Sequence, residues 1–252
     1  MLKNLNDYLP KKGFNNYIEP FLGGGSIFFY LSPKDAILSD LNSELIETYC
    51  ILRDSVEPII DVLQTYSNTE SFYYQIRSKI PKSEIERAAR FIFLNQTSFN
   101  GIYRVNLKGE YNVPYGFRTK NFLQEENLRS ASECLKSVII KSRDFYRSLE
   151  DVKKGDLVIL DPPYTVTHNN NGFIKYNAKL FDLNAQIALS KYIDCVNEIG
   201  ANYILTNAAH EDIRKIFTRK HNVIETTSRA SLVGGSKAKR GKYDEFIITN
   251  IH

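Results

Sequence analysis

The fold is indicated first by the stretch YIEPFLGGGS at residues 17–26. Tyr17-Ile18 is short and apolar, as expected for a buried strand, and the glycines that follow allow a tight turn into a helix. A second strand, residues 36–39, ends at Asp40, and Asn42 then caps a second helix. Strands and helices that alternate in this way are typical of α/β proteins with a parallel sheet.

The alternation stops after residue 54 and resumes near residue 135. Five further strands are predicted from apolar runs at residues 138–140, 157–160, 203–205, 223–224 and 246–248. The last two lie close together in the sequence, which favours an antiparallel pair. The sequence therefore predicts an α/β fold in which residues 1–54 and 135–252 form a Rossmann-like sheet of seven strands.

Residues 55–134 are predicted to form an inserted, mainly helical subdomain. Ser83 and Glu86 have the spacing of a capping box, and apolar residues recur after them with the helical period. The segment 100–116 follows this helix and is typical of a β-hairpin with its turn near Lys108-Gly109. We therefore expect the insertion to present a hairpin to solvent.

The composition is that of an ordinary globular protein. Of the 252 residues 42% are hydrophobic and 25% charged. No run approaches the roughly 18 apolar residues of a membrane span, and residues 1–12 are too polar for a signal peptide. Cys50, Cys134 and Cys195 lack C-x-x-C spacing, and the four histidines form no H-x-x-x-H pair. We expect a cytoplasmic protein with no membrane partner and no metal site.

Charge is unevenly distributed along a chain whose net charge is only +4. Residues 77–120 hold nine Lys and Arg against three Glu, and residues 215–242 hold eight against one acidic residue. Residues 28–63 run the other way, with seven acidic residues against two basic ones. Two basic segments suit a groove for a polyanion such as nucleic acid. Two solvated lysine-rich faces are the alternative.

Asp161-Pro162-Pro163-Tyr164 directly follows the predicted buried strand 157–160. Ligands of open α/β sheets bind beyond the carboxyl ends of the strands, so Asp161 is expected at a ligand-facing edge. The prolines cannot donate backbone hydrogen bonds, and the chain must leave the sheet with its carbonyls available as acceptors. A carboxylate, a carbonyl and an aromatic ring together suit the holding of a planar amino group for alkylation. A structural Pro-Pro turn with a packed tyrosine is the alternative.

The residues that follow three other predicted strands indicate a nucleotide-like ligand. Gly23-Gly24-Gly25 lets a ligand approach the backbone, but the G-x-G-x-x-G pattern is absent because position 28 is Phe28. Asp40 has about the spacing at which an acid reaches ribose hydroxyls, although it also suits a turn that starts the next helix. Asp144-Phe145 suits an adenine, through its carboxylate and its ring, and the ring suits a core position equally well. Together these ends indicate an adenosine ligand without a pyrophosphate.

These motifs, in this order, resemble the Dam-type (D12 class) DNA adenine methyltransferases. The resemblance extends from about Leu5 to Asn250 and rests on Glu19-Pro20-Phe21 with the glycines, Asn100-Gly101, residues 112–116, Asp144-Phe145 and residues 161–164. The closing segment of the family resembles Arg229, Arg240-Gly241-Lys242 and Glu245. A Gly-Lys segment that usually lies upstream in the family is not matched by Lys3, Lys11 or Lys12.

The resemblance implies a fold that binds S-adenosylmethionine, with a target-recognition insertion between its two halves. It implies cofactor contacts from Phe21, Gly23, Gly24, Gly25, Asp40, Asp144, Phe145 and Asp161. It also implies catalytic roles for Asp161, Pro162 and Tyr164. The first two would accept the hydrogens of the amino group, and the Tyr164 ring would stack on the base.

A base inside duplex DNA hides its amino group, so the target must be flipped out. The predicted hairpin is the candidate for recognising the DNA sequence. Arg104 could bind the edge of a guanine, and Asn100 could contact a base edge. Phe99 or Ile102 could insert between stacked bases. The resemblance implies base-reading roles for Arg104 and Pro114, with a phosphate contact as the alternative for Arg104. Phosphate contacts are expected from Lys237, Lys239, Arg240 and Lys242.

The leading hypothesis is site-specific transfer of a methyl group from S-adenosylmethionine to the amino group of a flipped adenine in double-stranded DNA. The alternatives are methylation of the cytosine amino group, methylation of a protein glutamine, and a non-catalytic DNA-binding relative. The protein substrate is disfavoured because it usually goes with Asn at the position of Asp161. A cognate restriction endonuclease is a candidate partner, and the sequence leaves open a phage or housekeeping role and the recognised site.

Overall fold

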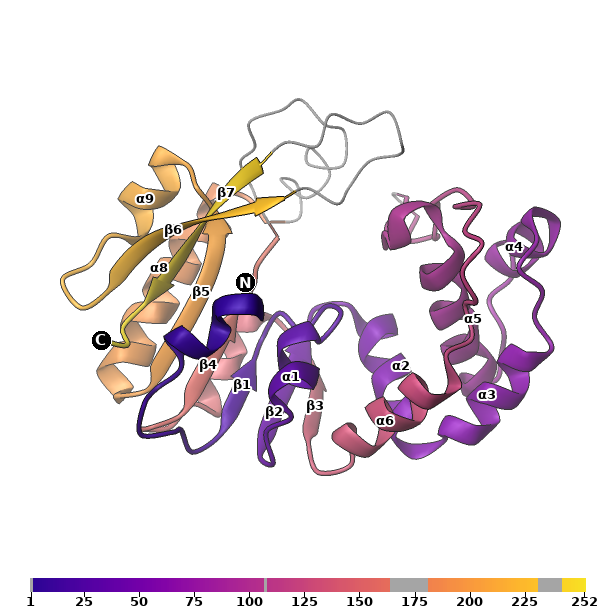
Figure 1. Ribbon diagram of the computed structural model, residues 1–252, viewed down its shortest axis with the longest axis horizontal. Helices are drawn as coiled ribbons and strands as arrows, with labels where there is room; N and C mark the ends of the chain where they lie inside the picture. The colour runs from indigo at the N-terminus through magenta and orange to yellow at the C-terminus, as the bar shows by residue number, and fades with distance from the viewer. Residues whose placement is uncertain (1, 107, 164–180, 231–241) are drawn as a thin grey trace. The chain divides into compact units, whose positions relative to one another are not determined.

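The protein is described by a computed structural model over residues 2–106, 108–163, 181–230 and 242–252 (Figure 1). Two compact units make up the chain: Met1–Leu41 together with Lys141–His252, and Asn42–Ile140. Within the described ranges, no helix combines the length and the apolar character that crossing a membrane requires.

The described residues form a mixed sheet of seven strands in the order β3-β2-β1-β4-β5-β7-β6. The strands are β1 (Tyr17–Glu19), β2 (Ala36–Asp40), β3 (Ile139–Ser142), β4 (Leu157–Leu160), β5 (Asn202–Ala208), β6 (Val223–Ala230) and β7 (Lys242–Thr249). Strands β2, β1, β4 and β5 pair in parallel, whereas β7 runs antiparallel to both β5 and β6. The predicted α/β fold, with its seven strands and antiparallel final pair, is confirmed.

Strand order reverses beside β1. The chain proceeds from β1 to β2 and β3 on one side, and β4 then lies on the other side of β1. In the resulting register Ile18 lies opposite both Ile37 and Val158. The loops that follow β1 and β4 therefore leave the same edge of the sheet at a reversal of strand order, which is where open α/β sheets bind their ligands.

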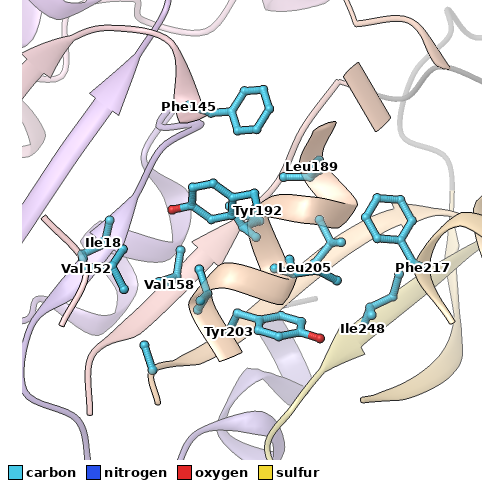
Figure 2. Packing of buried hydrophobic residues seen from close by; sticks show 14 of the residues in the cluster. Ile18, Phe145, Val152, Val158, Leu189, Tyr192, Tyr203, Leu205, Phe217 and Ile248 are labelled. Atoms are coloured by element: carbon cyan, nitrogen blue, oxygen red, sulfur yellow. The ribbon is translucent and has the colours of Figure 1, made fainter. Parts of the chain in front are cut away.

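The core of the first unit lies between one face of the sheet and helices α8 (Leu183–Ile199) and α9 (Glu211–Phe217), as Figure 2 shows. Alternate residues of the strands point into it, as the period of a β-strand requires. The buried members include Ile18, Val158, Leu160, Tyr203, Leu205, Leu189, Tyr192, Ile193 and Val196. As predicted, Asp182 caps α8 with its side chain, and Gly200 ends the helix with a φ of 83°.

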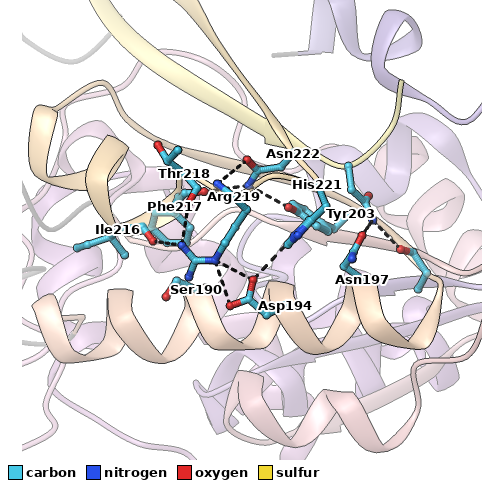
Figure 3. Close-up of polar contacts among 12 residues, drawn as sticks. Ser190, Asp194, Asn197, Tyr203, Ile216, Phe217, Thr218, Arg219, His221 and Asn222 are labelled. Atoms are coloured by element: carbon cyan, nitrogen blue, oxygen red, sulfur yellow. Dashed lines mark hydrogen bonds and ion pairs between the residues drawn. The ribbon is translucent and has the colours of Figure 1, made fainter.

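Ion pairs and hydrogen bonds join α8 to the segment after α9 (Figure 3). Arg219 Nε donates to both carboxylate oxygens of Asp194, at 2.8 and 3.1 Å. Asn222 donates to the hydroxyl of Tyr203 at 3.1 Å, which satisfies a polar group at the edge of the core. These contacts hold the helical layer to the strands.

The opposite face of β1 is covered by α1 (Ser26–Leu31), whose buried Phe28 lies 6.2 Å from the Tyr17 ring. Two short 3₁₀ helices, η1 (Leu2–Tyr8) and η3 (Phe145–Glu150), complete the regular elements described for this unit. Asp144 caps η3 by accepting the backbone N–H of Tyr146 at 2.9 Å.

The second unit is helical and is held by an aromatic core. Its helices are α2 (Ser43–Asp54), α3 (Val56–Gln64), α4 (Glu70–Arg77), α5 (Glu84–Thr97), η2 (Phe99–Gly101) and α6 (Glu125–Leu135). Asn42 and Ser83 cap α2 and α5, as predicted. The rings of Tyr66, Phe72, Tyr73 and Phe122 each pack within 6.4 Å of Phe93.

Helix α2 belongs with the second unit by its contacts, whereas the prediction placed residues 1–54 in the catalytic part. It packs against α3, α5 and α6. Its Glu47 pairs with Arg87 of α5 at 2.5 Å, and its Glu44 pairs with Arg90 at 3.3 Å. These partners are distant in sequence, so the local alternation of strands and helices could not reveal them. That alternation was the only basis on which the prediction placed α2 with the sheet.

The segment predicted as a hairpin doubles back on itself. The backbone N–H of Asn106 donates to Glu110 O at 2.8 Å, and that of Gly109 to Asn106 O at 3.0 Å, so the predicted turn is confirmed. Beyond the turn, pairing consists of isolated bridges, Val105 with Tyr111 and Ser98 with Tyr115, rather than continuous strands. Pro114 interrupts the second arm because it has no N–H to donate.

Candidate functional site

The predicted ligand-binding residues follow neighbouring strands at one edge of the sheet. The backbone N–H of Gly23, in the loop after β1, donates to Asp40 Oδ2 at 2.9 Å. Leu22 N–H donates to Ser39 O at 3.0 Å, so the loop after β1 lies against the end of β2. Asp40 thus holds the glycine loop in place.

The three glycines differ in what they require. Gly25 has a φ of 61°, and an added Cβ would lie 2.9 Å from the Phe29 ring, so both conformation and packing demand glycine. Gly23 also has a positive φ, 47°, but a Cβ there would meet nothing within 4 Å, and at Gly24 it would meet only Ser26 Oγ at 3.9 Å. The exposed backbone of Gly23 and Gly24 is therefore open to close approach by a ligand.

Aromatic rings gather behind this loop. Phe21 stacks on Phe145, with ring centroids 5.1 Å apart, and Phe181 meets Phe21 edge-on at 5.6 Å. Phe145 is buried and also contacts Tyr192, so it belongs to the core, while Phe21 is half-buried. Asp144 is exposed and caps η3, and its contact with an adenine stays a prediction.

Asp161 follows β4 and receives a hydrogen bond from Thr206 Oγ1 of β5 to its Oδ1. The register explains the contact, since Leu160 lies opposite Leu205. Sequence reasoning missed Thr206, although a polar residue directly after the predicted strand 203–205 was the available signal. Pro162 is buried, and Tyr164 lies outside the described residues.

Glu19, the last residue of β1, is a buried carboxyl, 2% exposed, that accepts a hydrogen bond from the Tyr17 hydroxyl at 2.7 Å. Burial raises the pKa of Glu19 to about 8; the Tyr17 hydrogen bond opposes this rise, and the charges of Asp161 and Asp40 add to it. Glu19 was noticed only as part of a motif. With this pKa, Glu19 keeps its proton below about pH 8, and a cationic ligand at this edge would be attracted by Asp40 and Asp161.

Within the part of the chain that the structure describes, no group of three or more His, Cys, Asp and Glu side chains is placed to hold an ion.

The predicted DNA-contact residues of the second unit surround η2 and the segment that doubles back. Phe99 and Asn100 are exposed, with Asn100 at a φ of 57°, while Ile102 is half-buried and Pro114 exposed. Arg104 Nε donates to Asn112 Oδ1 at 2.8 Å, and Nη2 to Asn112 O at 3.3 Å. The Arg104 guanidinium is therefore oriented by a neighbour on the opposite arm.

Several arginines of the basic segment 77–120 serve the unit itself. Arg87 and Arg90 pair with the glutamates of α2, and Arg77 Nη1 donates to Val113 O at 2.9 Å. Part of the local positive charge is thereby neutralised by the acidic segment that precedes it. Of the basic residues predicted near the end of the chain, Lys237, Lys239 and Arg240 lie outside the described residues. Lys242 begins β7, and its side chain is likewise not described.

Comparison with known proteins gives matches over most of the chain. A family model described as D12 class N6 adenine-specific DNA methyltransferase matches residues 1–231. The Type II methyltransferase M1.LlaDCHI of Lactococcus lactis subsp. cremoris is 34% identical, covering 99% of this chain and 91% of that protein. The Type II methyltransferase M.MjaIII of Methanocaldococcus jannaschii is 33% identical, covering 98% and 94%. The DNA adenine methylase of Escherichia coli (strain K12) is 28% identical, covering 95% and 88%.

Glu19→Gln is expected to remove a pH dependence of stability. With a pKa of about 8 when folded and 4.5 as the ordinary value, the carboxyl keeps its proton only in the folded state over this window. The free energy of unfolding of the wild type therefore falls as pH rises from 4.5 to 8, by on the order of a few kcal/mol. Glutamine still accepts from Tyr17 and carries no charge, so the variant should be the more stable protein at pH 8.

Thermal unfolding at both ends of this pH window measures the effect. Glu198→Gln, at an exposed position of α8, is the control and should keep the pH dependence of the wild type. An equally steep loss of stability in Glu19→Gln would show that Glu19 is not the group responsible.

Proposed function

Because the chain belongs to the D12 class of N6 adenine-specific DNA methyltransferases, we propose that S-adenosylmethionine binds at the carboxyl edge of β1, β2 and β4. Family membership confirms the predicted reaction, methylation of the adenine amino group in DNA, over the cytosine, protein and non-catalytic alternatives. The observation that carries the proposed site is the meeting of the glycine loop with Asp40 beside the reversal of strand order.

The residues at this edge fit S-adenosylmethionine. Its ribose offers hydroxyls to a carboxylate such as Asp40, which can accept several hydrogen bonds. Its positive charge matches the side chains of Asp40 and Asp161, which lie near the protonated Glu19, and the open backbone at Gly23 and Gly24 admits a ligand closely. For the adenine, Asp144 and the Phe145 ring are the proposed contacts, with Phe21 beside the ring. When bound, the cofactor supplies an electrophilic methyl group.

Asp161 and Pro162 are proposed to prepare the target nitrogen. The lone pair of an adenine amino group is delocalised into the ring, so the nitrogen is a poor nucleophile. If the Asp161 carboxylate and the Pro162 carbonyl each accept one amino hydrogen, the nitrogen is drawn towards tetrahedral geometry and its lone pair is aimed. Positioning of this kind accounts for much of the rate, and Asp161 need not be a strong base because the alkylated nitrogen is acidic.

Thr206 is proposed as a positioning residue for this step. Its hydroxyl is buried and donates to Asp161 Oδ1, which fixes the plane of the carboxylate. Tyr164 is proposed to stack on the flipped base, as the resemblance implies.

We further propose that the second unit, Asn42–Ile140, recognises the DNA target. Arg104 is the proposed guanine reader, and its hydrogen bonds to Asn112 support this role because they fix the guanidinium before DNA binds. Phe99, Asn100, Ile102 and Pro114 are proposed beside it, with phosphate contacts from Lys237, Lys239, Arg240 and Lys242.

A role in restriction-modification, with a cognate endonuclease, is favoured by the relatives. Two Type II methyltransferases are 34% and 33% identical over nearly the whole chain. The DNA adenine methylase of Escherichia coli is 28% identical.

DNA from a methylation-free host that expresses the chain should carry N6-methyladenine within one short sequence motif. Single-molecule sequencing reports the base and its context together. Protection of this DNA against an endonuclease encoded beside the chain is expected from the restriction-modification role. Full cleavage at the methylated motif would exclude that role and leave the methyltransferase activity standing.

Asp161→Ala and Asp40→Ala should fail in different ways. Asp161→Ala removes the acceptor of the amino group and should lower transfer of tritiated methyl groups to DNA by roughly 10²–10³-fold, by analogy with other preorganised hydrogen bonds. Asp40→Ala removes the acceptor of the ribose hydroxyls and should weaken the binding of S-adenosylmethionine roughly tenfold, which calorimetry measures. Wild-type transfer rates in Asp161→Ala would remove Asp161 from the mechanism, and wild-type affinity in Asp40→Ala would remove Asp40 from the cofactor site.

Thr206→Val should lower kcat by roughly tenfold because Asp161 loses the hydrogen bond that orients it. The KM for DNA and the affinity for S-adenosylmethionine should stay close to their wild-type values. Thr206→Ser keeps a hydroxyl and should restore most of the activity. Equal kcat in Thr206→Val and Thr206→Ser would show that the hydrogen bond does not assist the reaction.

A further inference from the structure

Phe117 is the most exposed aromatic side chain in the described part of the protein. It is 70% exposed, and Phe99, the other exposed phenylalanine of the second unit, is 46% exposed. Its ring touches only the edge of the Tyr115 ring among the aromatic contacts described, with centroids 4.9 Å apart. A large apolar ring left in water gains none of the stabilisation that burial provides.

The backbone of Phe117 is also in an unfavourable conformation. Its φ is 49°, in the left-handed region that bulky residues rarely adopt, and only Ser32 and Asn100 share a positive φ among the described non-glycine residues. A strained conformation persists only where its surroundings determine it, and such residues gather at functional sites.

Hydrogen bonds on both sides hold Phe117 in this conformation. Before it, Gly116 N–H donates to Thr97 O at 2.8 Å, and a Cβ at Gly116 would lie only 2.4 Å from Ser98 O. After it, the carbonyl of Arg118 accepts from Asn68 Nδ2 at 2.8 Å. The fold therefore fixes an exposed ring in a strained conformation that its own packing does not need.

The surroundings of Phe117 match the chemistry of nucleic acid. Arg118 Nη1 donates to Gln96 O at 3.4 Å, and Nη2 lies 3.2 Å from the place where a Cβ of Gly101 would stand. The Arg118 guanidinium thus joins the turn at Phe117 to the turn that carries Phe99 and Asn100. Exposed rings beside a guanidinium suit a base or sugar face and the phosphate next to it.

We propose that Phe117 is a DNA-contact residue of this methyltransferase, which packs its ring on a base or sugar of the substrate while Arg118 approaches the neighbouring phosphate. The proposal rests on DNA as the substrate. It adds Phe117 and Arg118 to the surface formed by Phe99 and Asn100, and it explains both the exposure and the strain of Phe117.

Phe117→Asn is the decisive variant because Asn tolerates the left-handed conformation but has no ring. Its affinity for a fluorescein-labelled duplex carrying the methylated motif, measured by anisotropy, should fall roughly tenfold, as for the loss of one stacked aromatic ring. The KM for DNA should rise in parallel, while the affinity for S-adenosylmethionine stays unchanged. The melting temperature should stay level or rise, since the strain is relieved.

Matched variants separate a DNA contact from a structural role. Phe117→Tyr keeps the ring and should bind DNA like the wild type. Ile80→Ala, at a position of the same unit that is 73% exposed, should also do so. Phe117→Gly relieves the strain completely and should repeat the loss seen in Phe117→Asn.

Wild-type DNA affinity in folded Phe117→Asn and Phe117→Gly would overturn the proposal. A change of oligomeric state with unchanged DNA affinity would also overturn it, in favour of an interface between copies of the chain. Absence of methyl transfer by the wild type would instead contradict the proposed function, and the anisotropy comparison, made then with a mixed-sequence duplex, would still test Phe117.

Discussion

The parallel pairing of β1 on both sides is the constraint on which the proposed catalytic site depends. Its three residues, Tyr17–Glu19, are buried and pair with β2 on one side, and Tyr17 and Ile18 also pair with β4 on the other. Because parallel strands end at the same edge, the glycine loop after β1 meets Asp40 there, and Asp161 emerges next to it. These residues meet only because β4 pairs with β1 on the side opposite β2.

The same pairing gathers three carboxyl groups at an edge where ionisation of Glu19 would be costly. Glu19 is buried at the end of β1, and Asp40 and Asp161 both raise its pKa. A protein stabilised for its fold alone would place apolar residues here, since a buried carboxyl needs compensation. The Tyr17 hydroxyl gives part of that compensation, and the proton that Glu19 keeps below about pH 8 removes its charge. The charge cluster is therefore easier to understand as a binding property than as a contribution to stability.

The second unit has a well-packed interior, but it leaves large aromatic rings exposed on its surface. Aromatic rings around Phe93 fill the core. Arg87 and Arg90, which belong to a basic segment that the sequence suggested for polyanion binding, instead form ion pairs between α5 and α2. Phe99 and Phe117 nevertheless remain exposed, one of them on a strained backbone. Where a well-packed unit leaves large rings in water, a partner is the natural explanation, and for this family the partner is DNA.

The sequence by itself determined the features that depend on local physics. Alternating apolar runs gave the number of strands, and short-range hydrogen bonding gave the caps at Asn42, Ser83 and Asp182. Only the tertiary structure decided that Thr206 meets Asp161, 45 residues away, and that Arg104 bonds to Asn112 although regular strand pairing is interrupted at Pro114. It also decided that α2 belongs with the helical unit. Strand register and the pairing of buried charges arise from packing between remote segments, and no local pattern of residues encodes them.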